Sequence, residues 1–428
     1  METAIEASYS LGFRSQDVTA LEELLQMHHS VELIGMKRVG IDNFLRFFLT
    51  HKNIPQEAHH LFILVDLNTL IERELFAFWR LTFKRIADAV RDSSLDKITQ
   101  ARIAKIFDKG IQSGDLFLTY DGVRESLEIL AKAGITPIII FSRFDRLKDA
   151  ITDEFFDNLQ SLKDATGNKL SYVFTTYREL ETLAPLVFKT KSVAIFSRIH
   201  YIKPAESKDM EVILASFEER YAISIEKTMR EQIIFLSGGH VQYLQLLLII
   251  YYELSKKENI SLEEFKQIVE ADERIMLQSE ELWESLTKEE QEILKKTLHK
   301  QKFSQQERGK AKYLWDTGFI TQEENSNQLF SSLFSHYLAK MAQQGHETML
   351  WELTKKEHTL FSYLQENVEG ICEREKIIEI VWPEYKDYGV SDWSVDKLVA
   401  RVRNKLKKQK SEFEIITVKT RGYKLVSV

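Results

Sequence analysis

The sequence is poor in cysteine, glycine and proline, and each shortage excludes a class of protein. Among 428 residues there is one cysteine, Cys372, so the chain can form no internal disulfide and no thiolate cluster for a metal. With 16 glycines and 5 prolines, it lacks the composition of collagen-like repeats and long flexible linkers. The longest apolar run, residues 244–254, is too short to span a bilayer, and the first residues do not resemble a secretory signal. We therefore expect a helix-rich cytoplasmic protein without membrane contact.

Charge is distributed unevenly along the chain. The net charge of −7 argues against a uniformly basic coat for nucleic acid. Residues 394–428, however, contain ten Lys and Arg and three Asp and Glu, a net charge of +7, which leaves −14 for residues 1–393. Because salt screens charges beyond about 8 Å at physiological ionic strength, this basic segment can attract DNA although the rest of the chain is acidic.

Short apolar runs alternate with amphipathic segments in the first half of the sequence. Runs of strand length occupy residues 31–34, 61–65, 137–141 and 170–174, with a weaker run at 192–196. Strands that alternate with helices form a parallel sheet covered by helices. The sequence therefore predicts an α/β domain over residues 1–203. At about 150 residues per domain, the whole chain is long enough for about three domains.

Helical periodicity replaces the strand runs after residue 203. Residues 204–283 are expected to form a helical subdomain, in which Ser237-Gly238-Gly239 opens an apolar helix. A capping box at Thr287 and Glu290, two short helices, a glycine turn and a hairpin-like end predict a first winged helix over residues 284–343. Its charges are mixed and form no basic stripe, which favours packing or partner contact over DNA binding.

A last module is predicted over residues 347–428. It opens with a second capping box, Thr354 with Glu357, and ends in two β-rich pieces that flank a tight turn. Residues 342–346 are the expected flexible joint before it.

A glycine-framed loop follows the first predicted strand. Gly35 and Gly40 have the spacing of a nucleotide phosphate loop, and a helical pattern follows them. Ile41 replaces the lysine that would reach the terminal phosphates, and Asp42 replaces the hydroxyl that would hold Mg²⁺. A carboxylate in the first helical turn also competes with a phosphate for the same amide donors.

The third predicted strand ends without the two carboxylates that hold metal and polarise water in such a pocket. Ser142 and Arg143 occupy these positions. Two cations in the loop, Lys37 and Arg38, leave weak binding of ATP or ADP open. An unrelated α/β fold, in which these segments are ordinary core strands, is the structural alternative.

Residues 12 to about 345 resemble the AAA+/STAND ATPases of the archaeal-ATPase and origin-recognition type. Four segments carry the resemblance: Gly12-Phe13-Arg14-Ser15-Gln16-Asp17, Leu64-Val65-Asp66-Leu67-Asn68, Tyr172-Val173-Phe174-Thr175-Thr176 and Gly238-Gly239-His240-Val241-Gln242-Tyr243-Leu244-Gln245. They correspond to the family's Gly-Arg-Glu box, second strand, sensor-1 strand and lid helix. The resemblance implies a P-loop NTPase-like (AAA+) core with a helical lid. Since the residues that stabilise phosphoryl transfer are replaced, we predict a pseudo-ATPase that needs no cofactor.

A long basic helix is predicted from Ser394 onward. Val395, Leu398, Val399, Val402 and Leu406 form one apolar stripe. The opposite face carries Lys397, Arg401, Asn404, Lys405 and Lys408, with Arg403 and Lys407 at its flanks. Such a helix packs on a core while it presents cations, although a charged face of this kind is also typical of a merely solvated helix.

The end of the chain resembles the OmpR/PhoB-type winged helix over nearly its whole length. The resemblance rests on a Leu353-Thr354 start, a Val381-Trp382 helix end, a Val395-Asp396 helix opening and a Thr417-Val418 to Gly422-Tyr423 hairpin. In that family the recognition helix enters the major groove and the wing reaches the minor groove or the backbone. The candidate DNA contacts are Ser394, Lys397, Leu398, Arg401, Arg403, Asn404, Lys405 and Lys408 on the helix, and Lys419 and Arg421 on the wing. Trp393 and Leu398 depart from the family's usual residues, which predicts a weaker or a different base readout.

The sequence thus predicts a DNA-binding protein in which a catalytically inactive AAA+/STAND-like scaffold precedes two winged helices. It would act as a transcriptional regulator or as the DNA-recruiting subunit of a larger complex, with double-stranded DNA and a protein partner or a second copy as partners. Two alternatives remain: a switch whose oligomeric state responds to NTP, and an adaptor whose winged helices contact proteins. The histidines at 28–29, 59–60 and 240 lack ligands at metal-site spacing, so no metal site is expected.

Overall fold

The computed structural model divides the chain into two compact units, residues 1–335 and 336–428. The residues that the structure describes are 5–51, 60–185, 187, 198–255, 260–323, 326–344, 353, 355–382, 392–408, 411–418 and 421–427. Each unit is described by itself below.

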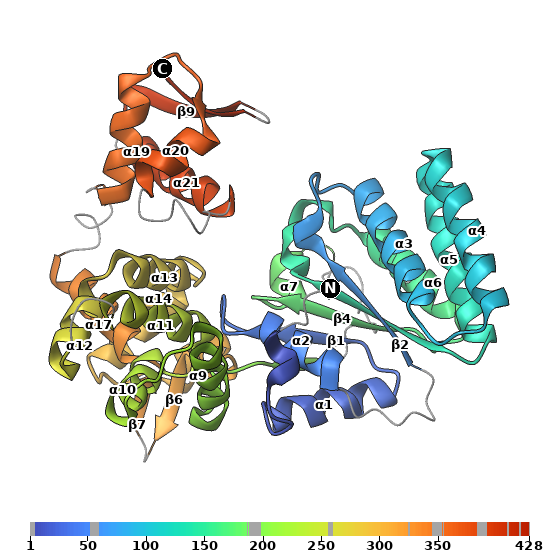
Figure 1. The fold of residues 1–428 in the computed structure, drawn as a ribbon, viewed down its shortest axis with the longest axis horizontal. Coiled ribbons are helices and arrows are strands. Elements are labelled where there is room, and N and C mark those ends of the chain that lie inside the picture. The colour runs from blue at the N-terminus through green and yellow to red at the C-terminus, as the bar shows by residue number, and fades with distance from the viewer. Residues whose placement is uncertain are drawn as a thin grey trace. The chain divides into compact units, whose positions relative to one another are not determined.

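A parallel five-stranded sheet forms the centre of the α/β part of the first unit (Figure 1). The strands are β1 (Val31–Ile34), β2 (His60–Asp66), β3 (Thr136–Ser142), β4 (Ser171–Thr176) and β5 (Arg198–Tyr201), in the order β2-β3-β4-β1-β5. β3 and β4 are buried at every position, as is typical of parallel strands covered on both faces. Because all neighbours are parallel, the carboxyl ends of β1, β2 and β3 lie at the same edge.

Helices pack on both faces of this sheet. On one face, Phe48 of α2 (Ile41–His51) contacts Phe62 of β2, with 5.8 Å between the ring centroids. On the other face, Phe78 of α3 (Leu75–Arg91) lies 5.1 Å from Phe141 of β3 and also 5.1 Å from Phe155 of α6. The other helices of this region are η1 (Ile5–Ser8), α1 (Ser15–Gln26), η2 (Leu67–Thr69), α4 (Lys97–Ser113), α5 (Leu116–Lys132), η3 (Phe144–Ala150), α6 (Asp153–Ala165) and α7 (Leu180–Leu183).

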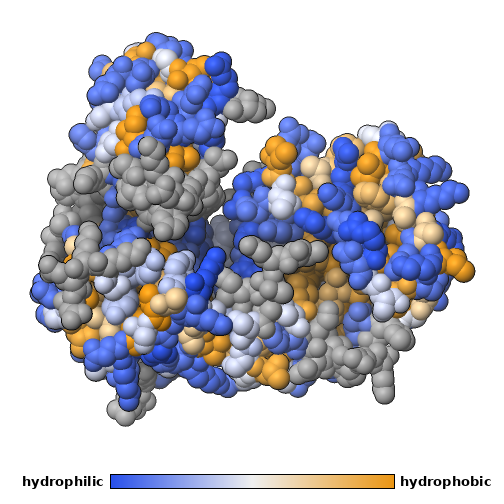
Figure 2. Space-filling model, viewed as in Figure 1, coloured by the Kyte–Doolittle hydropathy of each residue, from blue (hydrophilic) through white to orange (hydrophobic). Residues whose placement is uncertain are grey.

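Three helices of 17 residues each, α3, α4 and α5, separate β2 from β3. The ring of Phe83 on α3 lies against Gly110 and Gly122, where a Cβ atom would approach it to 2.7 Å. The two glycines thus let α4 and α5 pack closely on α3. Phe117 and Ile98 of these helices are exposed, and Figure 2 shows hydrophobic residues scattered among hydrophilic ones over this region.

The rest of the first unit is mainly helical. Helices α9 (Ser207–Tyr221), α10 (Lys227–Ser237), α11 (Val241–Ser255), α12 (Leu262–Ala271) and α13 (Glu273–Glu284) form the lid region. They are followed by α14 (Lys288–Leu298), α15 (Gln305–Lys310), α16 (Tyr313–Asp316), the antiparallel hairpin β6 (Ile320–Glu323) and β7 (Ser326–Leu329), and α17 (Ser332–Gln344). The predicted capping box of Thr287 and Glu290 is present at the start of α14.

The second unit contains helices packed on a three-stranded antiparallel sheet in the order β8-β10-β9. Its elements are α19 (Lys355–Glu366), β8 (Cys372–Glu373), α20 (Arg374–Val381), α21 (Asp392–Lys408), β9 (Phe413–Val418) and β10 (Gly422–Ser427). Leu360, Ile377, Val399 and Leu425 meet in its core. Gly422 lies against the backbone of Cys372, so the pairing of β8 with β10 leaves no room for a side chain there.

Four predicted strands coincide with β1 to β4 within one or two residues at each end. The predicted strand at 192–196 lies outside the described residues, and the described fifth strand, Arg198–Tyr201, begins after it. Thr354 of the second predicted capping box and most of residues 342–346 also fall outside the part that can be fully described. The two units divide within α17, before the predicted joint. The predicted domain boundaries at 203, 283 and 343 stay predictions.

Candidate functional site

The loop between β1 and α2 packs tightly against the lid. Gly40 has a φ of +112°, and a Cβ atom there would lie 2.5 Å from Cγ2 of Val241 at the start of α11. At Gly35 a Cβ atom would lie 2.8 Å from the carbonyl oxygen of Ile202 and 3.3 Å from Cδ1 of Ile41. Both predicted glycines are therefore needed for the loop to fit between β5 and the lid.

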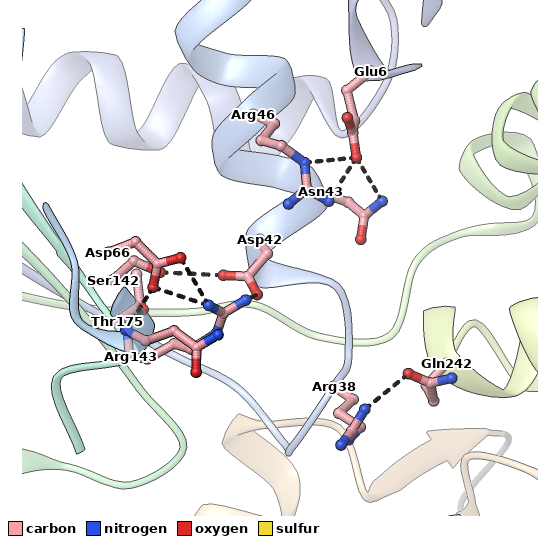
Figure 3. A network of polar contacts seen from close by, with 11 residues as sticks. Glu6, Arg38, Asp42, Asn43, Arg46, Asp66, Ser142, Arg143, Thr175 and Gln242 are labelled. Atoms are coloured by element: carbon pink, nitrogen blue, oxygen red, sulfur yellow. Dashed lines mark hydrogen bonds and ion pairs between the residues drawn. The ribbon is translucent and has the colours of Figure 1, made fainter. Parts of the chain in front are cut away.

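Polar contacts also tie this loop to the lid. Nε2 of His240 donates to the carbonyl oxygen of Lys37 at 2.9 Å, and its Nδ1 accepts from the amide of Tyr243 at 3.3 Å. Arg38 donates to Glu281 at 3.0 Å and to Gln242 at 3.2 Å, the latter contact being visible in Figure 3. Lys37 lies 4.8 Å from the ring centre of Tyr177. The two loop cations that could attract a nucleotide thus contact groups of the protein itself.

Arg143 joins two carboxylates at the edge of the sheet (Figure 3). Its Nη2 donates to Asp42 of α2 at 2.5 Å, and its Nη1 donates to both carboxylate oxygens of Asp66 at 2.9 and 3.0 Å. Ser142 donates to the other oxygen of Asp42 at 3.2 Å. These residues come from α2 and from the ends of β2 and β3, so the predicted positions Asp42, Ser142 and Arg143 meet at one place.

The backbone positions the Arg143 side chain. Arg143 has a φ of +59°, which is uncommon for a residue with a side chain, and its amide donates to Oγ1 of Thr175 on β4 at 2.8 Å. Although burial alone would lower it, the pKa of Arg143 is raised because Asp42 and Asp66 stabilise the guanidinium cation. The pocket edge therefore carries a permanent cation of its own.

His240 makes the first unit sensitive to acid. Burial lowers the pKa of His240 from 6.5 to about 4. As the pH falls below about 6.5, His240 becomes protonated in the unfolded chain, whereas in the folded protein it stays neutral until about pH 4. The stability that this histidine contributes is thus complete above pH 6.5 and is lost between pH 6.5 and 4. We expect a loss of about 2 kcal/mol between pH 7.5 and 5 from this group.

Urea unfolding of the wild type and of His240→Gln at pH 7.5 and 5 measures this contribution. It is the difference between the two proteins in how much the free energy of unfolding changes between the two pH values. The comparison between the two proteins is needed because burial also raises the pKa of Glu32 to about 7. The contribution of that carboxyl to stability therefore changes with pH in the opposite direction. Equal slopes in the two proteins would contradict the assignment.

A buried ion pair that the sequence analysis missed connects the segment after β4 with α14. Arg178 donates to the two carboxylate oxygens of Glu290 at 2.7 and 2.5 Å and to the carbonyl oxygen of Ser285 at 2.7 Å. Its guanidinium carbon lies 3.7 Å from the ring centre of Tyr313, whose hydroxyl donates to the carbonyl oxygen of Tyr177 at 2.7 Å. Glu290 was noticed only as a capping residue, and the sequence gives no pattern that connects it with Arg178.

In the second unit, the face of α21 that is exposed differs from the face that the sequence predicted to be exposed. Asp396, Ala400, Asn404 and Lys407 are exposed, and Lys397 is half-buried. These positions follow each other at three- and four-residue intervals, so they lie on one side of the helix. Arg421, at the turn between β9 and β10, is exposed as well. The predicted contacts Lys397, Asn404 and Arg421 therefore reach the surface.

Three other predicted DNA contacts are buried, which contradicts their assignment. Leu398 is part of the core, with 3% of its surface exposed, and Arg401 retains 8%. Lys405 donates to Glu357 of α19 at 2.6 Å, and the side chains are 7% and 0% exposed. The interpretation was wrong because it placed Arg401 and Lys405 on the face opposite the apolar stripe, whereas both side chains are buried and Lys405 contacts α19.

Arg403 contributes to the helix–hairpin contact. Its Nε donates to the carbonyl oxygen of Ile415 at 2.6 Å and its Nη2 donates to Thr417 at 2.8 Å, both on β9. We therefore assign it a positioning role. The side chains of Ser394 and Lys408 and the whole of Lys419 lie outside the described part, so their predicted DNA contacts stay predictions.

Within the described ranges, no helix is both long and apolar enough to cross a bilayer. In the same ranges, no three His, Cys, Asp or Glu side chains come together as a set that could hold a metal ion.

Comparisons with known proteins give a family for the end of the chain and structures of similar fold for most of the chain. Residues 347–425 match the family described as "Transcriptional regulatory protein, C terminal". The structure of the Walker-type ATPase PABY2304 of Pyrococcus abyssi is similar, with a TM-score of 0.50 and 15% identity over 78% of this chain and 100% of that chain. The ADP form of the Aeropyrum pernix ORC2 protein gives a TM-score of 0.42 and 11% identity over 78% of this chain and 96% of that chain. A search of curated proteins gave no match.

The predicted fold class is confirmed. The chain is multidomain, with a parallel α/β core whose fold resembles that of the Walker-type ATPase and a C-terminal winged helix that matches the transcriptional-regulator, OmpR/PhoB type. The predicted fusion of a core of this fold with a C-terminal winged helix is thereby confirmed as well.

Proposed function

We propose that this chain is a transcriptional regulator that holds duplex DNA with its C-terminal winged helix and uses its AAA+-type core as a scaffold. The observation that carries the proposal is the exposed face of α21 in a domain that matches a transcriptional-regulatory family. Lys397 and Lys407 on this face and Arg421 on the wing supply cations for phosphates, and Ala400 and Asn404 between the two lysines are uncharged.

Fluorescence anisotropy with the full-length protein and a labelled duplex tests this function. With these three phosphate contacts, affinity should fall roughly fortyfold between 50 and 200 mM salt. An absence of binding at low salt would refute DNA binding and leave the adaptor alternative.

We further propose that the core does not hydrolyse ATP. Mg²⁺ and a triphosphate need a P-loop lysine, a metal-holding hydroxyl and free carboxylates. Here Ile41 and Asp42 occupy the first two positions, and Arg143 is paired with both Asp42 and Asp66. A metal ion at these carboxylates would have to displace a guanidinium, so the residues present do not fit the metal, and we assign no step to it.

Turnover of ATP in the presence of Mg²⁺ should accordingly stay at the background of a mock preparation. Lys37 and Arg38 support at most weak nucleotide binding, which a thermal shift with ATP or ADP would reveal. Turnover that disappears in Gly40→Ala, whose Cβ would collide with Val241, would overturn the proposal.

A further inference from the structure

On the exposed face of α21, two uncharged side chains lie among charged ones. This face, here called the outer face, consists of Asp396, Lys397, Ala400, Arg403, Asn404 and Lys407. Ala400 and Asn404 lie at its centre, one helical turn apart, and both are exposed. Lys397 precedes them and Lys407 follows them. The charged positions can therefore contact the DNA backbone on either side while the centre approaches the base edges.

Two charged residues of the outer face, Asp396 and Arg403, make hydrogen bonds within the domain. Asp396 accepts from Arg374 of α20 at 2.6 Å and also from the hydroxyl of Tyr423 on β10. Arg403 is fixed on β9 through Ile415 and Thr417. These contacts fix α21 on the hairpin and the neighbouring helix, so the outer face keeps a defined orientation. They also engage the one arginine of the face that could otherwise pair with guanine.

The chemistry of the two central side chains selects one kind of base pair. The side-chain amide of asparagine can donate from its NH₂ group to N7 of adenine and accept with its carbonyl oxygen from N6 in the major groove. The alanine methyl group packs against the C5-methyl group of thymine. We infer that Asn404 reads an adenine and Ala400 reads a nearby thymine methyl, so that this winged helix selects a site with A·T pairs at its centre. This inference rests on the proposed DNA binding.

The spacing of the pair limits where the two contacts fall. Four residues of helix correspond to about 6 Å along its axis, and successive base pairs are about 3.4 Å apart. The adenine and the thymine therefore lie within about two base pairs of each other in the selected site.

Selection from a random duplex pool with the full-length protein, followed by base-analogue substitution, tests the inference. We expect an adenine at one central position. Replacing it with 7-deazaadenine, which lacks N7, should weaken binding by the wild type about tenfold and should leave Asn404→Ala unaffected. Replacing the neighbouring thymidine with deoxyuridine, which lacks the methyl group, should weaken DNA binding by the wild type by a smaller factor.

Two variants serve as controls. Gln365→Ala removes an exposed amide from α19 in the same unit and should bind like the wild type. Lys407→Ala should weaken binding to all sequences equally and lower the salt dependence by about one phosphate contact. If 7-deazaadenine weakens DNA binding by the wild type and by Asn404→Ala to the same extent, the inference on base readout is wrong, although DNA binding still stands. Binding without any sequence preference would also contradict the base readout alone. An absence of binding at low salt would contradict both the base readout and the proposed DNA binding.

Discussion

Replacing Arg178 with methionine is expected to destabilise the first unit by about 3–5 kcal/mol, because it leaves the carboxylate of Glu290 buried without its main partner. The side chains of Arg178 and Glu290 are 6% and 4% exposed, so water cannot replace the lost contact. The variant also loses the contact with the Tyr313 ring and the hydrogen bond to Ser285. Urea unfolding of the full-length protein measures the change.

A matched control separates this effect from the general loss of an arginine. Arg124 is 46% exposed and pairs with Glu128 on the surface of α5, so Arg124→Met should cost less than about 1 kcal/mol. The double variant Arg178→Met, Glu290→Met should be more stable than Arg178→Met alone, because no buried charge remains unpaired. If Arg178→Met and Arg124→Met shift the midpoint equally, the buried pair does not stabilise the unit.

Replacing Lys405 with methionine is expected to remove about 3–5 kcal/mol from the winged helix and, through unfolding, most of its DNA binding. The carboxylate of Glu357 is fully buried and would lose its 2.6 Å contact with Lys405. A loss of this size is a large part of the 5–15 kcal/mol that stabilises a typical domain. Circular dichroism during thermal unfolding detects it directly.

Lys407→Met is the matched control on the same helix. Lys407 is exposed, so its replacement should leave the unfolding midpoint within the error of the wild type and weaken DNA binding severalfold at low salt. The pair of variants thus distinguishes a structural lysine from a DNA-binding lysine two residues away. Equal stability of Lys405→Met and Lys407→Met would contradict the buried pair.

The fold of this chain could be predicted largely from local patterns. Runs such as that of residues 137–141 are apolar over their whole length because both faces of a central parallel strand are covered. The spacing of the glycines at 35 and 40 and the capping box at Thr287 are likewise patterns within a short stretch of sequence. These features predicted the α/β core, the loop after its first strand and the start of α14.

The sites were harder to predict because they depend on contacts between distant segments. Periodicity identified the apolar stripe of α21 but not which side of the stripe would also be buried. Lys405 is buried because it pairs with Glu357, which lies 48 residues away in the sequence. Arg178 and Glu290 are separated by 112 residues, and no local pattern connects them. At the pocket, the sequence showed that Arg143 replaces a carboxylate, whereas its pairing with Asp66, 77 residues away, became evident only in the structure.

DNA binding by the outer face without the help of nucleotide is the central claim, and one anisotropy titration tests it most directly. The full-length protein, its Lys407→Glu variant and the Gln365→Ala control would be titrated against one labelled duplex, with and without ATP and Mg²⁺. The wild type and the control should bind equally, with nucleotide changing the affinity by less than about twofold, while Lys407→Glu should bind at least about tenfold more weakly. Binding that requires ATP, or that Lys407→Glu leaves unchanged, would contradict the account.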